Sequence, residues 1–132
     1  MQTIIKGTIG ELSIKKRLLE DGYNIFTPEV DNGTDLIVEC TNGILKRVQV
    51  KSISQLKTNT SVEIKTEKYM ENSLIDVIAV YLGKDIEHFG NMIAFVPYTK
   101  QHTIVLALTT GKNNQEKKRN WFYQYNRFPE FS

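Results

Sequence analysis

Three polar residues at one end of a predicted β-hairpin have the chemistry to act on a phosphodiester bond. Asp35 begins the first strand of this hairpin, and Gln49 and Lys51 lie near the end of the second. Carboxylate and amide oxygens are hard ligands that suit Mg²⁺, and such a metal lowers the pKa of a bound water and stabilises charge on phosphate. An ammonium group orients the attacking water or neutralises the phosphate. The alternative is a turn residue, Asp35, beside a solvated strand face that carries Gln49 and Lys51.

The hairpin spans residues 35–51 and positions these three side chains. Two alternating apolar segments flank the Thr41-Asn42-Gly43 turn, a pattern typical of paired antiparallel strands. A three-residue loop with Gly43 in the left-handed conformation places Leu36 opposite Val48 on the buried side. The same register gathers the three polar residues on the other side, and a slip of one residue would destroy both groupings.

A helix is predicted over residues 8–21, ending at Gly22. Its apolar spacing predicts the core-facing residues Ile9, Leu12, Leu18 and Leu19. Thr8 and Glu11 have the spacing of a capping box, which would give Glu11 a structural role. The alternative is that Glu11 leans over the hairpin as a further ligand of the metal or of a water.

Basic and polar side chains in three segments are candidates for contact with a nucleic-acid backbone. The alternative for each segment is an ordinary solvated surface. The candidates are Lys15, Lys16 and Arg17 on the helix, Ser52, Gln55 and Lys57 after the hairpin, and Lys112, Lys117, Lys118 and Arg119 near the C-terminus. Aromatic residues follow the last group, and we expect them to pack or to form a subunit interface.

The remaining chain predicts a mixed α/β domain. Residues 74–82 form the strongest apolar run and indicate a fully buried strand. Further strands are expected at 23–30, where Pro28 restricts the strand to an edge, an end or a bulge, and at 61–65, 91–98 and 101–108. One or two helical turns are expected at 66–73. His102 has no metal-ligand partner at useful spacing. His88 and Asn91 could suggest a His-Asn nuclease motif, but no second motif element supports it.

Length and composition indicate one domain of 132 residues, with a core at about 7–108 and a basic and aromatic extension at 109–132. The net charge of +2 neither demands nor excludes a polyanionic partner. The single cysteine, Cys40, excludes an intramolecular disulfide and fits a reducing, intracellular (cytoplasmic) setting. No apolar run reaches membrane-spanning length, and we expect no membrane partner.

The order of these features resembles the PD-(D/E)XK nuclease superfamily. A helix with Glu11, a strand, Asp35 at the start of a second strand and Lys51 on a third follow that family's order over residues 7–82. Gln49 stands where most members have an acid, and Thr34 where many have proline. The Glu, Asp, Gln-x-Lys pattern is most similar to a small group of intron-encoded homing endonucleases.

The resemblance implies a restriction-endonuclease-like core, with a mixed β-sheet flanked by helices, and a metal-dependent DNA endonuclease. The implied catalytic residues are Glu11, Asp35, Gln49 and Lys51, and the implied metal ligands are Asp35, Gln49, Glu11 and the Val50 carbonyl. The implied cofactor is Mg²⁺, for which Mn²⁺ substitutes, and the implied partner is double-stranded DNA. Cutting both strands suggests a dimer or tetramer. A junction-resolvase-like nuclease and a non-catalytic binding module on the same fold remain as alternatives.

Overall fold

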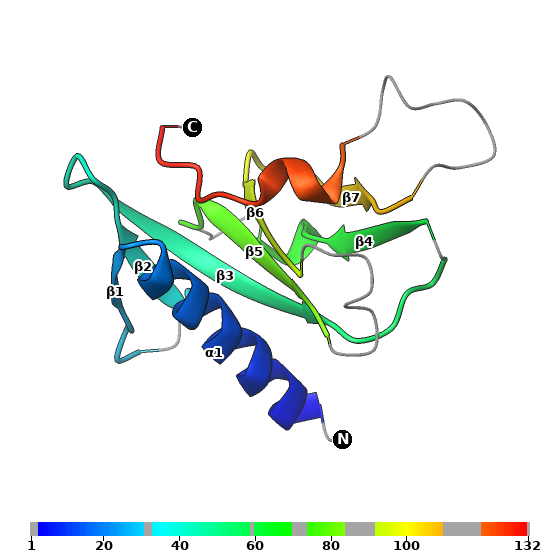
Figure 1. Cartoon of the computed structure of the whole chain (residues 1–132), viewed down its shortest axis with the longest axis horizontal. Coiled ribbons are helices and arrows are strands. Elements are labelled where there is room, and N and C mark those ends of the chain that lie inside the picture. The colour runs from blue at the N-terminus through cyan, green and yellow to red at the C-terminus, as the bar shows by residue number, and fades with distance from the viewer. Residues whose placement is uncertain are drawn as a thin grey trace.

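The computed structural model describes residues 3–30, 33–58, 60–69, 74–83, 92–109 and 120–131. A five-stranded mixed sheet has the strand order β1-β2-β3-β5-β6, and a separate two-stranded sheet is formed by β4 and β7 (Figure 1). The described elements are α1 (Thr3–Glu20), β1 (Asn24–Phe26), β2 (Leu36–Glu39), β3 (Leu45–Ile53), β4 (Ser61–Lys65), the 3-10 turn η1 (Glu67–Tyr69), β5 (Val77–Leu82), β6 (Ile93–Pro97), β7 (Thr103–Ala107) and the 3-10 turn η4 (Phe122–Tyr125). No helix within these ranges is long and apolar enough to cross a membrane.

The predicted hairpin register is confirmed. Leu36 pairs with Val48 and Glu39 with Leu45, and Gly43 has a φ of 85° in the turn, a conformation that costs glycine little. β3 then runs parallel to β5, whose six residues are all buried. A parallel pair with both faces covered explains the unbroken apolar sequence of β5.

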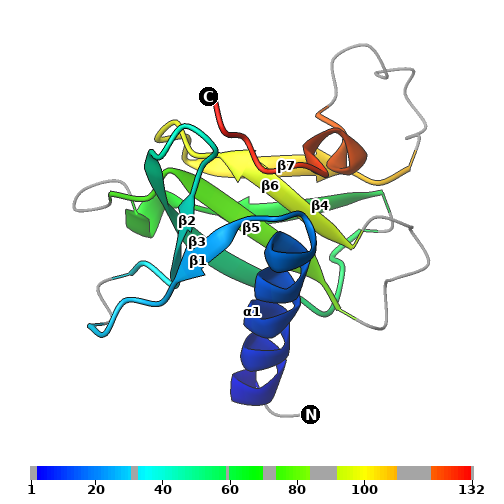
Figure 2. The ribbon, with the colours of Figure 1, turned by 60° about the vertical axis from the view of Figure 1, so that its left-hand side comes forward.

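Helix α1 covers one face of the sheet, as the two views show (Figures 1 and 2). Its buried residues, Gly10, Ile14 and Leu18, recur every four positions and so line one side of the helix. A Cβ at Gly10 would lie 1.7 Å from Ser52 Oγ, so glycine permits this close approach to β3. The helix ends as predicted, at Gly22 with a φ of 92°.

Two predictions about α1 are wrong. The helix begins at Thr3, so Thr8 lies inside it and donates its hydroxyl to the Ile4 carbonyl at 2.9 Å. A Thr hydroxyl satisfied by the carbonyl four residues earlier cannot cap a helix start. Of the four residues predicted to face the core, Leu18 is buried, whereas Ile9, Leu12 and Leu19 are exposed.

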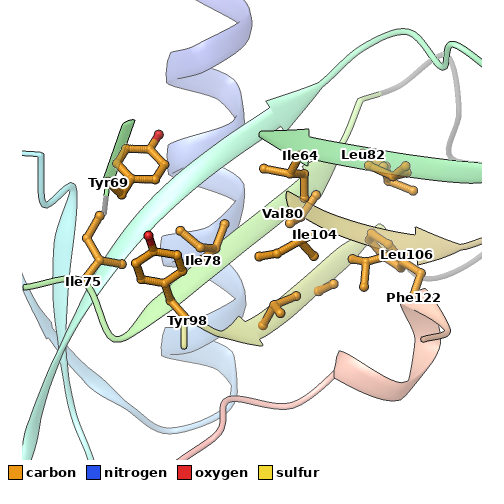
Figure 3. Packing of buried hydrophobic residues seen from close by; sticks show 13 residues of the cluster. Ile64, Tyr69, Ile75, Ile78, Val80, Leu82, Tyr98, Ile104, Leu106 and Phe122 are labelled. Carbon is orange, nitrogen blue, oxygen red and sulfur yellow. The ribbon is translucent and has the colours of Figure 1, made fainter. Parts of the chain in front are cut away.

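The opposite face of the sheet is covered by β4 and β7 rather than by a second helix. Figure 3 shows the resulting apolar cluster in front of the sheet, with the helix behind it. Tyr69 and Tyr98 lie at one end of this cluster, and Leu82 and Phe122 lie at the other (Figure 3). The two-stranded cover explains why residues 61–65 and 101–108, far apart in sequence, alternate between buried and exposed.

One further predicted element is shorter than expected, and another agrees with its prediction as far as it is described. The strand predicted at 23–30 is limited to Asn24–Phe26 and lies at an edge of the sheet, the position that Pro28 favours. In the segment predicted to be helical, η1 forms one turn at Glu67–Tyr69, and residues 70–73 lie outside the described part of the chain.

The core extends beyond residue 108 into the C-terminal segment. Phe122 is buried with the β4–β7 cluster, and Phe128 is buried on the helix face, where its ring lies 5.7 Å from that of Phe95. Lys46 Nζ donates to the Pro129 carbonyl at 2.5 Å. The predicted packing of the tail aromatics is therefore confirmed for these two phenylalanines, while Phe131 is exposed.

Candidate active site

Asp35 directly precedes β2, at the point where the pairing of β2 with β3 stops while β3 continues. Its backbone N–H donates to the Val48 carbonyl at 2.9 Å, and its Oδ2 accepts a 2.8 Å hydrogen bond from the Val50 N–H. Interstrand hydrogen bonds lie roughly within the sheet, perpendicular to the strands. The carboxylate therefore sits beside β3 near the plane of the sheet, in the place of a further strand residue.

The Val50 carbonyl points to this same edge of β3. The carbonyls of Arg47 and Ile53 accept hydrogen bonds from Asp76 and Gly83 on the β5 side. Backbone groups alternate along a strand, so the Val50 carbonyl is directed to the opposite edge, where the Asp35 carboxylate lies. A carboxylate and a backbone carbonyl, both hard oxygen donors, are thus presented together.

Gln49 contributes a third oxygen of the same kind. Its Oε1 atom is buried, and within the described part of the chain it has no hydrogen-bond partner. Leaving a buried acceptor unpaired costs about 1–3 kcal/mol, and a cation or an ordered water would remove that cost. The residues present therefore fit a hard divalent cation, although no group of three His, Cys, Asp or Glu side chains in the described ranges could hold a metal ion.

Lys51 lies on the same side of β3 as Gln49, two residues further on. Its Nζ is 5.0 Å from the centroid of the Tyr69 ring. Burial, and then the hydrogen bond and charge of the neighbouring Lys68, lower the pKa of Lys51 to about 8, and the charge of Asp35 opposes this lowering. Near pH 8 this amine is therefore close to its titration point, unlike a solvated lysine.

A pocket of about 500 Å³ opens beside Lys51, between β3, β4 and η1. Its lining combines three lysines with two acids and two isoleucines: Lys51, Lys65, Lys68, Glu63, Glu67, Ile53 and Ile64. Glu67 is engaged with His102, whose Nδ1 lies 3.8 Å from Oε1. The pocket is therefore an open hollow of mixed charged and apolar lining next to the candidate catalytic lysine.

Glu11 is placed on the other face of the sheet, where α1 packs. Its neighbour Gly10 faces Ser52, whereas Gln49 and Lys51 alternate with Ser52 on β3 and so point away from the helix. The Glu11 carboxylate lies 3.6 Å from Lys15 Nζ. The fold thus brings Asp35 close to Val50 and Lys51 of β3, with Gln49 on the same strand, whereas Glu11 lies on the helix side of the sheet.

The candidate DNA-contacting residues have different positions. Lys16, Gln55 and Lys57 are exposed. Arg17 is held by Asp21 at 3.1 Å and by the Asn126 carbonyl, and the Ser52 hydroxyl is buried beneath the helix, so we do not propose a DNA contact for Ser52. The basic group Lys112, Lys117, Lys118 and Arg119 lies outside the described residues, as does His88.

Two residues of the site were not identified from the sequence. Lys68 and Tyr69 come from η1, a single turn in a short charged segment. The adjacent Lys68 and Tyr69 were the only sign in the sequence of a binding role, and no local sequence pattern relates these two residues to Lys51. Only the crossover from β3 to β5 brings this turn over the site.

Comparisons with known proteins agree with this geometry. A family model described as PD-(D/E)XK endonuclease matches residues 1–128, a longer span than the 7–82 covered by the resemblance in sequence. Among solved structures, the bacterial homing endonuclease I-Ssp6803I has a TM-score of 0.66 and 24% sequence identity, over 94% of this chain and 86% of that one. This likeness shows a shared restriction-endonuclease-like fold. No curated protein sequence matches the chain.

Proposed function

The chain belongs to the PD-(D/E)XK endonuclease family, and from that membership we propose that it hydrolyses phosphodiester bonds of double-stranded DNA with a divalent metal ion, Mg²⁺ or Mn²⁺. One observation carries the proposal. The Asp35 carboxylate and the Val50 carbonyl are directed to one edge of β3, while Gln49, whose buried Oε1 has no partner among the described residues, and the half-buried Lys51 lie on one face of the same strand. An acid, two neutral oxygens and an amine are the groups that metal-assisted phosphate hydrolysis requires.

Each residue has a distinct proposed role. Asp35, Gln49 and the Val50 carbonyl hold the metal, which when bound supplies charge stabilisation and a lower pKa for water. Lys51 orients the attacking water or neutralises charge on the phosphate. Glu11 acts from the helix side as a ligand of the metal or of a water.

Gln49 has a consequence for metal affinity. An amide supplies an oxygen without a charge, so this ligand set carries less negative charge than the acidic version found in most of the family. We therefore expect weak metal binding in the free protein, strengthened when a DNA phosphate adds a negative oxygen. The same substitution is the observation that favours the second candidate function, a DNA-binding module without cleavage.

A cleavage assay on a mixture of plasmid and genomic DNA tests the proposal. Asp35→Asn keeps an oxygen that can accept the Val50 N–H but removes the charge, and Lys51→Met removes the amine. Each is expected to lower the metal-dependent cleavage rate at least about a hundredfold to a thousandfold. Glu39→Gln is the matched control, because Glu39 is an exposed acid at the far end of β2, the strand that Asp35 directly precedes.

The fragment pattern separates the finer possibilities. Discrete fragments would support a site-specific homing or restriction enzyme, which is the form we propose. Cutting confined to a four-way junction substrate would indicate a resolvase-like enzyme. A folded wild type that binds DNA in a salt-sensitive way but never cuts would establish the binding module instead.

We further propose that the active protein is a homo-oligomer, a dimer or tetramer. Each chain presents one site, and two strands of a duplex must be cut in opposite polarity, which a two-fold axis provides. Sedimentation with and without DNA tests this. A monomer that makes double-strand breaks in a single binding event would contradict it.

A further inference from the structure

A second lysine lies beside the candidate catalytic lysine. Lys51 Nζ is 5.0 Å from the centroid of the Tyr69 ring, and Lys68 Nζ is 5.2 Å from the same centroid. The two side chains come from different elements, β3 and η1, and line the same pocket of about 500 Å³. They are close enough for a direct side-chain interaction with each other. Two amines therefore converge over a single aromatic ring.

Two neighbouring cations repel each other unless something compensates their charge. The charge of Asp35 supplies part of that compensation at Lys51, but no direct ion pair among the described residues does so. In the described ranges Glu67 is directed to His102, and no carboxylate lies within 4 Å of either lysine amine. The Tyr69 ring attracts both amines through its negatively polarised face. An anion in the pocket would complete the compensation.

Phosphate is the anion that the site is suited to receive. Lys51, which lines the pocket, is two residues from Gln49 and is close enough to Asp35 to feel its charge, and lysines bind phosphate as compact point charges with three donors each. Glu63 also lines the pocket, so its carboxylate would disfavour an anion placed near β4 rather than near the two amines. The favoured position is between Lys51 and Lys68.

We propose that Lys68 and Lys51 together bind one DNA phosphate group, the one at the cleaved bond, and that the Tyr69 ring positions both amines. The identity of the ligand as a DNA phosphate rests on the proposed function. The arrangement of the two lysines does not depend on that function. Lys68 is then a second substrate-binding cation of the site. Tyr69 acts through the lysines as a positioning residue.

Single-turnover cleavage of a DNA substrate tests the role of Lys68. Lys68→Met is expected to slow cleavage about tenfold to a hundredfold and to reduce the salt dependence of DNA binding by about one counterion. Lys68→Arg keeps the charge and is expected to recover much of the rate. The matched control is Lys100→Met, because Lys100 Nζ also lies over a tyrosine ring, 5.6 Å from the Tyr98 centroid, but outside the pocket lining.

A binding measurement without metal or DNA separates this proposal from the function. Side-chain NMR of ¹⁵N-lysine protein is followed during titration with inorganic phosphate at constant ionic strength, with chloride as the reference. The Lys51 and Lys68 signals are expected to shift with one common concentration dependence, while the Lys100 signal does not. In Lys68→Met the Lys51 shift is expected to be lost. Tyr69→Leu should weaken both shifts, and Tyr69→Phe, which keeps the ring, should preserve them.

The outcomes are distinct. Lys68→Met that cuts as fast as wild type, or a Lys51 shift that persists unchanged in that variant, overturns the two-lysine site. A wild type that shows the paired shifts but cuts no DNA keeps the site and overturns the proposed function. Far-ultraviolet circular dichroism and urea unfolding are used first to confirm that each variant is folded, and the conclusions above are drawn only for folded variants.

Discussion

The two faces of the central sheet are buried in different ways. On the helix face, Ile14, Leu18 and Phe95 are fully buried, and Phe128 from the C-terminal segment packs against Phe95. On the other face, the β4–β7 cover and η1 leave an open pocket at Lys51 that is lined by charged and apolar side chains. Buried side chains close the helix face of the sheet, whereas the other face is open beside Lys51, the candidate catalytic lysine.

Strand β3 shows the difference within a few residues. Val48 is fully buried and the Ser52 hydroxyl is pressed under Gly10 on the helix side, whereas Gln49 and Lys51 alternate with them on the pocket side. The tight packing of Val48 and Ser52 fixes the position of β3. Gln49 and Lys51 are therefore held on a rigid strand. A site on a well-packed strand holds its groups more accurately than one on a loop. The comparison predicts that variants on the helix face mainly change the free energy of unfolding, whereas variants on the pocket face mainly change cleavage.

The largest expected effect is on the helix face. Phe128→Ala should lower the free energy of unfolding by about 3–5 kcal/mol, because it empties a buried aromatic site, while the folded fraction retains its cleavage rate. Urea unfolding and single-turnover cleavage measure the two quantities. Phe131→Ala is the control, since Phe131 is 81% exposed, and it should change stability by less than about 0.5 kcal/mol. Equal losses in both variants would mean that the C-terminal segment does not pack as described.

A smaller effect is expected where α1 meets β3. Gly10→Ala should destabilise the protein by about 1–3 kcal/mol through overpacking, because the new methyl group would lie 1.7 Å from Ser52 Oγ. Adding Ser52→Ala removes that oxygen and should recover part of the loss. A double-mutant cycle by urea unfolding measures the coupling. Strictly additive effects would contradict the direct contact.

On the site face, Gln49→Glu should alter metal use more than stability. It restores the negative charge that most of the family has at this position, so we expect the Mg²⁺ concentration for half-maximal cleavage to fall by roughly tenfold, on the basis of an added carboxylate ligand. Calcium binding to the free protein by calorimetry gives a second readout. An unchanged requirement for Mg²⁺ in both assays would remove Gln49 from the ligand set.

The smallest expected effect is a shift in titration. Lys68→Met should raise the pKa of Lys51 from about 8 toward its ordinary value, because removing a neighbouring cation favours the protonated amine. Burial is the larger cause and persists, so the pKa should remain below that of a solvated lysine. Side-chain NMR across pH 6–11 (roughly the range in which lysine titrates) measures it. A fall in the pKa would show that the two amines are not neighbours.

Local patterns in the sequence determined much of the site. Alternation and the Gly43 turn predicted the pairing of Leu36 with Val48 correctly, and with it the side of β3 on which Gln49 and Lys51 lie. Such patterns are readable because side chains alternate along a strand and an error of one residue would bury charges. The apolar run of β5 was readable for a related reason, since both of its faces are covered.

Long-range packing decided the rest. The sequence of α1 offers two apolar stripes, and only contact with β3 selects the one with Gly10 and Ile14 and leaves Leu12 exposed. Lys68 reaches Lys51 because a crossover places η1 above the sheet. Local periodicity does not encode that contact, because η1 and β3 meet only once the chain has crossed over the sheet.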